Sequence, residues 1–171
     1  FDKAKKLRDR FELRRDDETI FYVRFFDTQN YTKNIFQVTN QVTQIKNYES
    51  RYDVTLLING LPLVQIELKR RGKEIKAAFN QIKRYQKQSF SGTLFEYLQV
   101  IVISNGVNTK YFSNNPKQSA KQVFYWTDRE NRKITDLKDF SEIFFQPHFL
   151  TEMIGEYIVL AEAERIPMIL R

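Results

Sequence analysis

Three polar side chains interrupt the most apolar part of this chain at a spacing that suits metal-dependent chemistry. Asp53 lies in "RYDVTLLI", and Glu67 and Lys69 lie in "LVQIELK". Mg²⁺ prefers oxygen ligands, and it is usually held by one or two carboxylates together with water and substrate phosphate. We therefore expect Asp53 and Glu67 to bind Mg²⁺, with the backbone carbonyl of Leu68 as a third oxygen ligand.

Lys69 follows Glu67 by two residues, so both side chains leave a strand on the same face. A lysine in this place could orient or help to deprotonate the attacking water, or it could stabilise negative charge on phosphorus. Either role belongs to the hydrolysis of a phosphodiester bond. The competing interpretation is structural, because alternating polar and apolar residues with Glu and Lys facing solvent are typical of half-exposed strands.

The two segments meet at Asn59-Gly60, a strong hairpin signal, and the loop length decides whether the acids face each other. A three-residue loop over 59–61 pairs Ile58 with Pro62 and places Asp53 opposite Glu67. A two-residue loop places Asp53 opposite Ile66, on the wrong face. The chemistry therefore predicts an odd-numbered loop.

The hydrophobic pattern predicts the elements around this hairpin. Residues 73–88 place Ile75, Phe79 and Ile82 at helical spacing, and residues 34–45 alternate as a strand does. Further strands are expected within 97–106, 108–113 and 121–127, helices within 1–18, 134–145 and 149–160, and a short strand or buried connector at 20–26. This order predicts an α/β or α+β fold with a mixed sheet.

Composition restricts the chemistry further. The 171 residues include no cysteine and one histidine, His148, which excludes disulfides and cysteine-bound zinc and argues against a Ser-His-Asp triad. The formal net charge of +7 favours a polyanionic partner, most simply nucleic acid. No run of about 18 apolar residues occurs, so we expect no membrane span.

Basic residues are concentrated after Lys69, in "LKRRGK" and in the helix that follows. Such a cluster would neutralise backbone phosphates of DNA, although a solvated helix face is the structural alternative. The residues expected to bind DNA are Arg70, Arg71, Lys73, Lys76, Lys83 and Arg84.

An Asp separated by 13 residues from "ELK", followed by a helix with Q-x-x-x-Y at Gln81 and Tyr85, resembles the PD-(D/E)xK nucleases of the RecB-type branch. The chain is most similar to the N-terminal nuclease domain of the restriction (R) subunit of type I restriction–modification enzymes. "AFNQIKRYQ", "LFEYLQVIVISNGVNTKYF", "WTDRENRKITDLKDF" and "FFQPHFLTEMIGEYIV" carry this resemblance beyond the motif.

The resemblance implies a restriction-endonuclease-like α/β fold with a central mixed sheet flanked by helices. It also implies catalytic roles for Asp53, Glu67, Lys69, Gln81 and Tyr85, with the last two supporting the site or holding DNA near it. Tyr52 replaces the proline of the family's "PD". Some members use an upstream acidic residue, for which Glu49 and Asp27 are the candidates here.

The family further implies cytoplasmic cleavage of double-stranded DNA, in a bacterium or archaeon, together with modification and specificity subunits. An ATP-driven, helicase-like motor would belong to the same full-length chain. No G-x-x-x-x-G-K-[ST] occurs in these residues, so ATP would serve only parts outside them. Cleavage would follow translocation and would need no reading of bases by this domain.

We expect an endonuclease domain over residues 1–147, with a catalytic core at about 34–113. Residues 148–171 would be a C-terminal extension that starts the linker toward the motor. A second function stays open at this stage: a nuclease-like fold can serve as a non-catalytic DNA-binding or docking module.

Overall fold

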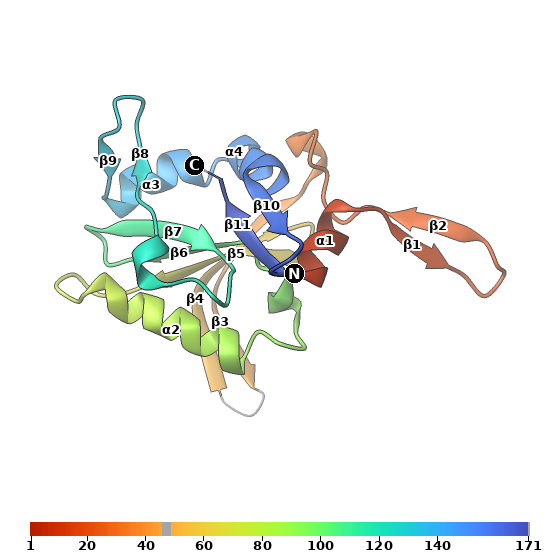
Figure 1. Ribbon diagram of the computed structural model, residues 1–171, viewed down its shortest axis with the longest axis horizontal. Helices are drawn as coiled ribbons and strands as arrows, with labels where there is room; N and C mark the ends of the chain where they lie inside the picture. Colours follow the sequence, from red (N-terminus) through yellow and green to blue (C-terminus); the bar gives the residue numbers. More distant parts are fainter. Residues whose placement is uncertain (46–48, 171) are drawn as a thin grey trace.

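The computed structural model describes residues 1–45 and 49–170, and its centre is a five-stranded mixed sheet (Figure 1). β5 and β6 are parallel, whereas the other neighbouring strands are antiparallel. The parallel pair requires a crossover, which the helix α2 (Ile75–Gln88) supplies. Across the sheet the strands are β3 (Phe36–Ile45), β4 (Glu49–Ile58), β5 (Leu61–Leu68), β6 (Val100–Ser104) and β7 (Thr109–Ser113). The predicted α/β restriction-endonuclease-like class is confirmed.

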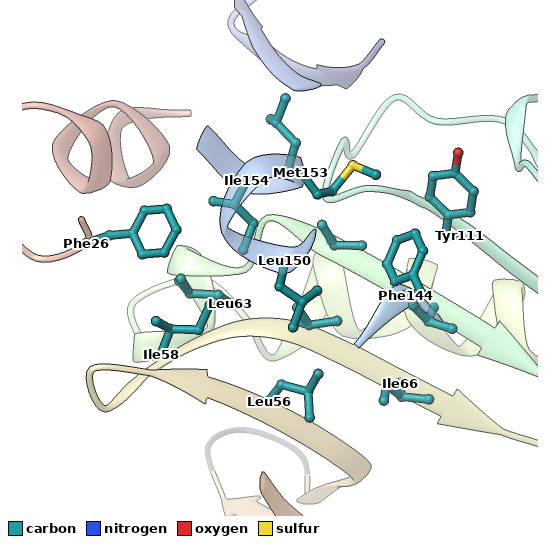
Figure 2. Close-up of a cluster of buried hydrophobic side chains, with 14 of the residues drawn as sticks. Phe26, Leu56, Ile58, Leu63, Ile66, Tyr111, Phe144, Leu150, Met153 and Ile154 are labelled. Carbon is teal, nitrogen blue, oxygen red and sulfur yellow. The ribbon is translucent and has the colours of Figure 1, made fainter. Parts of the chain in front are cut away.

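The central strands β5 and β6 are buried on both faces, each face beneath different elements, whereas the edge strand β3 is largely exposed. The helix α2 covers one face with Phe79 and Ile82, which pack against β6 and β7. The helices α3 (Leu137–Phe144) and α4 (Pro147–Glu152) cover the other face. Figure 2 shows this second core, which includes Leu56, Ile58, Ile66, Phe144, Leu150 and Ile154. A polar side chain on β5 therefore lies inside the protein whichever face it takes.

The hairpin that joins β4 and β5 differs from the expected one. Its loop has two residues, because Ile58 pairs with Leu61 rather than with Pro62. A β-bulge then shifts the register: Leu57 pairs with Pro62 and Leu56 pairs with Val64, which leaves Leu63 as an extra residue. The predicted odd loop is wrong, yet the bulge produces the same displacement of register that an odd loop would have given.

The N-terminal segment is only partly helical. The helix α1 (Asp2–Arg8) is followed by β1 (Phe11–Arg14) and β2 (Ile20–Val23), an exposed hairpin that projects from the body of the protein (Figure 1). The backbone amide and hydroxyl of Thr19 donate to the Asp17 carboxylate, which stabilises the turn between the strands. The expected helix over 1–18 is therefore wrong beyond Arg8, where alternation of apolar and charged residues favours a strand.

The C-terminal segment packs into the same core as the rest of the chain. After α4, a π-helical turn (Met153–Tyr157) ends the expected helix, and a hairpin of β10 (Ile158–Ala161) and β11 (Ile166–Ile169) follows. The Ser113 hydroxyl on β7 donates to the Pro167 carbonyl. The role of this segment as the start of a linker stays a prediction.

Short elements complete the chain. They are the 3₁₀ turns Tyr31–Lys33, Leu94–Tyr97 and Ala120–Gln122 and the strand pair β8 (Trp126–Thr127) and β9 (Lys133–Ile134). Of the strand expected within 121–127, only β8 and an isolated bridge between Phe124 and Tyr111 form. Within residues 1–45 and 49–170, no helix combines the length and apolar character that crossing a membrane would require.

Candidate active site

The bulge brings the two predicted metal ligands together. Val54 pairs with Ile66, so Asp53 and Glu67 face each other one residue farther along the hairpin. The Asp53 side chain accepts a 2.8 Å hydrogen bond from the Leu68 amide, which fixes one of its carboxylate oxygens. Asp53 also borders an open hollow of about 390 Å³. Asp53 is therefore accessible from solvent, whereas Glu67 is buried between the sheet and α2.

Glu67 is completely buried on the face that α2 covers. Its Oε1 atom accepts a 2.6 Å hydrogen bond from the Lys69 ammonium group. Its Oε2 atom is buried and has no hydrogen-bond partner. The alternative of a solvent-facing polar strand is therefore wrong for Glu67, because α2 removes that face from water.

Lys69 is held from three sides. Besides Glu67, its ammonium group donates to the Gln81 amide oxygen at 2.8 Å and to the Leu68 carbonyl at 3.3 Å. These three acceptors match the three donors of an ammonium group. The lysine is therefore fixed beside the Glu67 carboxylate rather than extended into solvent.

Gln81 and Tyr85 form the second half of this network. They are separated by four residues on α2 and so lie one above the other. The Gln81 amide nitrogen donates to the Tyr85 hydroxyl at 2.5 Å, and that hydroxyl donates to the Arg51 carbonyl at 2.8 Å. Burial raises the pKa of Tyr85, so the hydroxyl remains a donor. The network connects Lys69, through α2, to the strand that carries Asp53.

The electrostatics of Glu67 reflect this burial. Removal from water raises the pKa of Glu67 from 4.5 to about 7. The Lys69 hydrogen bond opposes that change, whereas the negative charge of Asp53 adds to it. A buried carboxylate with one unpaired oxygen and an acidic neighbour is stabilised by any cation that reaches it.

The donor set fits a hard divalent cation. Two carboxylates face each other, the Leu68 carbonyl lies beside them, and the unpaired Glu67 oxygen supplies a free ligand atom. No group of three or more histidine, cysteine or acidic side chains converges in residues 1–45 and 49–170. Two carboxylates leave most coordination positions to water and phosphate oxygens, as is usual for Mg²⁺.

The basic residues expected to bind DNA separate into two groups. Arg70, Arg71 and Lys73 are exposed in the loop between β5 and α2, directly after Lys69. Gln81 and Lys83 flank Ile82 in sequence, so at 3.6 residues per turn they lie about 200° apart around α2. The Lys83 ammonium group donates to the Pro116 carbonyl, on the flank away from Gln81.

Lys76 and Arg84 are the other two basic residues of this set on α2. Lys76 follows Ile75 as Lys83 follows Ile82, so it shares the flank of Lys83, and it is exposed. Arg84 is exposed on the solvent side of α2, with its guanidinium group 5.6 Å from the centre of the Tyr85 ring. On α2 the basic residues therefore occupy one flank and the adjoining solvent-facing side, and the other three lie in the loop before the helix.

Sequence reasoning missed a residue that shapes the basic loop. The Asn105 amide nitrogen donates to the Lys73 carbonyl at 2.7 Å, while its oxygen accepts from the Asn108 amide at 2.8 Å. Asn105 thereby connects the loop to the turn that follows β6. The only sequence signal was an Asn-Gly turn directly after a buried strand, which does not identify a distant partner.

The two candidates for an upstream acidic residue lie away from the site. Asp27 accepts hydrogen bonds from the backbone amides of Gln29 and Asn30 and lies 3.8 Å from the Lys33 ammonium group. Glu49 is exposed at the start of β4, where it pairs with Ile45. Neither borders the hollow at Asp53.

The chain is similar to known proteins over most of its length. A family model described as type I restriction enzyme R protein N terminus matches residues 3–120. The chain is 54% identical over 172 residues to the type I restriction enzyme SauCOLORF180P endonuclease subunit of Staphylococcus aureus (strain COL), covering 100% of this chain. It spans only 18% of that relative's length.

Two further relatives have the same kind of description. The type I restriction enzyme SsaAORF53P endonuclease subunit of Staphylococcus saprophyticus is 51% identical over 172 residues, which is 100% of this chain and 18% of the relative. The type I restriction enzyme EcoprrI endonuclease subunit of Escherichia coli is 43% identical over 172 residues, which is 96% of this chain and 55% of the relative.

The raised pKa of Glu67 predicts how stability depends on pH in metal-free protein. A group whose pKa is higher in the folded than in the unfolded state stabilises the fold fully below the unfolded value, and loses this contribution as pH rises through the folded value. Between pH 4.5 and about 8, the free energy of unfolding of wild type should therefore fall by on the order of 3 kcal/mol relative to that of Glu67→Gln. Urea unfolding with a chelator present measures this difference.

Glu49→Gln is the matched control, because it changes an exposed glutamate on the neighbouring strand. Its stability should follow that of wild type across the same pH range. Parallel curves for wild type and Glu67→Gln would show that the buried carboxyl group titrates normally, which contradicts the account.

Proposed function

The chain belongs to the family of type I restriction enzyme R protein N termini, and from this premise we propose that it is a metal-dependent nuclease domain that cuts double-stranded DNA. The observation that carries the proposal is the pairing of Asp53 with a buried Glu67 that keeps one oxygen unpartnered beside a fixed lysine. This arrangement costs stability in an isolated domain, and it is useful where a cation must be bound.

Asp53, Glu67 and the Leu68 carbonyl would hold the metal, and we propose Mg²⁺. When bound, such an ion supplies a Lewis acid and lowers the pKa of its water. Lys69 donates to Glu67 and to the Leu68 carbonyl, which are both proposed metal ligands. A donor released when these oxygens bind metal would orient the attacking water or stabilise negative charge on the phosphate. Gln81 and Tyr85 keep Lys69 in position through the hydrogen bonds to α2 and Arg51.

The basic loop is the proposed DNA contact nearest to the site. Arg70, Arg71 and Lys73 would bind phosphates next to the bond that is cut. Lys76, Lys83 and Arg84 would bind phosphates farther along the duplex. These contacts read charge rather than bases, which agrees with a cutter whose sequence recognition belongs to another subunit.

The wider assembly is part of the proposal. The chain would be the endonuclease domain of an R subunit, with residues 1–147 as its main body and 148–171 leading toward an ATP-driven motor. It would act in the cytoplasm with modification and specificity subunits, after translocation. The names of the relatives as endonuclease subunits support this placement.

Loss of either acid or of the lysine should abolish DNA cleavage. Asp53→Ala, Glu67→Ala and Lys69→Ala remove groups that act on one reaction, so each should lower the cleavage rate of the full-length enzyme by at least about 10²-fold. Cleavage of a plasmid substrate with Mg²⁺ and ATP measures this, with ATP hydrolysis as the control for the motor. Cleavage that survived Asp53→Ala or Lys69→Ala would instead favour a non-catalytic DNA-binding or docking module.

The salt dependence of DNA binding separates the two basic groups. Each phosphate contact adds about 0.9 to the slope of log affinity against log salt concentration. Arg70→Ala and Arg71→Ala should each lower the slope by about one unit. Lys83→Ala should change it least, because the Pro116 carbonyl already accepts a hydrogen bond from its ammonium group. An unchanged slope for Arg70→Ala and Arg71→Ala would exclude the loop as a phosphate contact.

A further inference from the structure

The edge strand β3 has an uncommon backbone conformation directly across from Asp53. Gln41 has φ of 50°, in the left-handed region that residues other than glycine, asparagine and aspartate rarely adopt. Asn40 pairs with Val54 and Val42 pairs with Tyr52, so Gln41 is the residue that faces Asp53. The strand is therefore bent at the position where it meets the site, and such strain is characteristic of functional positions.

The bend changes where two neighbouring side chains lie. Successive residues of a regular strand point to opposite faces. Here Asn40 and Gln41 both line the hollow that Asp53, Lys69 and Arg70 also line. Both amide residues are exposed, and β3 is the outermost strand on this side of the sheet. Two consecutive amide residues thus line the hollow at the left-handed position.

The hollow has the chemistry of a phosphate site. The residues that line it include the amides Asn40 and Gln41, the cationic residues Lys69 and Arg70, and the acidic residue Asp53. The volume of about 390 Å³ has room for a phosphodiester and parts of its neighbouring sugars. A phosphate in this hollow would lie next to Asp53 and Leu68, two of the three proposed metal ligands.

An amide suits position 41 better than a charged group. A carboxylate there would add a negative charge beside Asp53 and repel phosphate. A lysine or arginine would form an ion pair with Asp53 and occupy it. The amide group of glutamine donates two hydrogen bonds and carries no charge, so it can bind a phosphate oxygen without either effect.

We propose that Gln41 is a DNA-binding residue of this site, whose side-chain amide donates to a phosphate oxygen of the strand that is cut. The inference rests on the proposed nuclease function and extends it to β3. The phosphate is held between the amides of β3 and the cations after β5, which fixes its distance from Asp53.

Two substitutions separate the amide from the backbone bend. Gln41→Gly removes the amide but suits the left-handed conformation, so the thermal midpoint of unfolding should be unchanged or higher. DNA cleavage by the full-length enzyme should fall about tenfold, as expected for one hydrogen bond to a charged group. Gln41→Glu keeps the shape and replaces the donor with a negative charge, so cleavage should fall further. ATP hydrolysis should be unchanged in both.

Gln37→Ala is the matched control, because Gln37 is exposed on the same strand, four residues before Gln41, and does not line the hollow. Its cleavage rate should equal that of wild type. Wild-type cleavage by Gln41→Gly or by Gln41→Glu would overturn the inference, since neither could then depend on a donor at position 41.

A third variant, Asp53→Asn, distinguishes failure of the Gln41 proposal from failure of the proposed nuclease site. If Asp53→Asn is inactive while Gln41→Gly cuts at the wild-type rate, the inference fails and the proposed nuclease stands. If Asp53→Asn still cuts, the proposed nuclease site fails and the inference fails with it.

Discussion

The contact between the Lys69 ammonium group and the buried Glu67 carboxylate, 2.6 Å long, is the interaction on which the site depends. Burying a carboxylate costs several kcal/mol, and a partner repays this only when the geometry is good and the remaining lone pairs are satisfied. Here one oxygen is satisfied and the other is not. The site therefore has an unbalanced negative charge where Asp53 faces Glu67. A divalent cation bound there would neutralise it.

The fold contributes to this arrangement through register and cover. A two-residue turn alone would have placed Asp53 against Ile66, and the extra residue Leu63 corrects this before the strands reach the site. The helix α2 then covers the face that carries Glu67. Its Gln81 accepts a hydrogen bond from Lys69 and donates one to Tyr85, which keeps Lys69 in position. Turn, bulge and helix thus act on the same three side chains, although they lie in different parts of the sequence.

Much of this could be predicted from the sequence, because periodicity and residue type are local signals. The alternation around Glu67 predicted its strand and face, and the spacing of Ile75, Phe79 and Ile82 predicted α2. The bulge at Leu63 could not be predicted, since nothing in "NGLPLV" distinguishes a bulge from a longer turn. The burial of Glu67, the contact of Lys83 with the Pro116 carbonyl and the left-handed conformation of Gln41 depend on which elements pack together, and a single sequence does not state that.

The most direct test of the central claim is calorimetric titration of Mn²⁺ or Mg²⁺ into the full-length protein without ATP, comparing wild type with Asp53→Ala and Glu67→Ala. We expect a binding event in wild type that both substitutions abolish, while circular dichroism shows the fold intact. Binding that persists in both variants, or its absence from wild type even with DNA present, would contradict the account. The two acids would then be a polar feature of the hairpin and not a metal site.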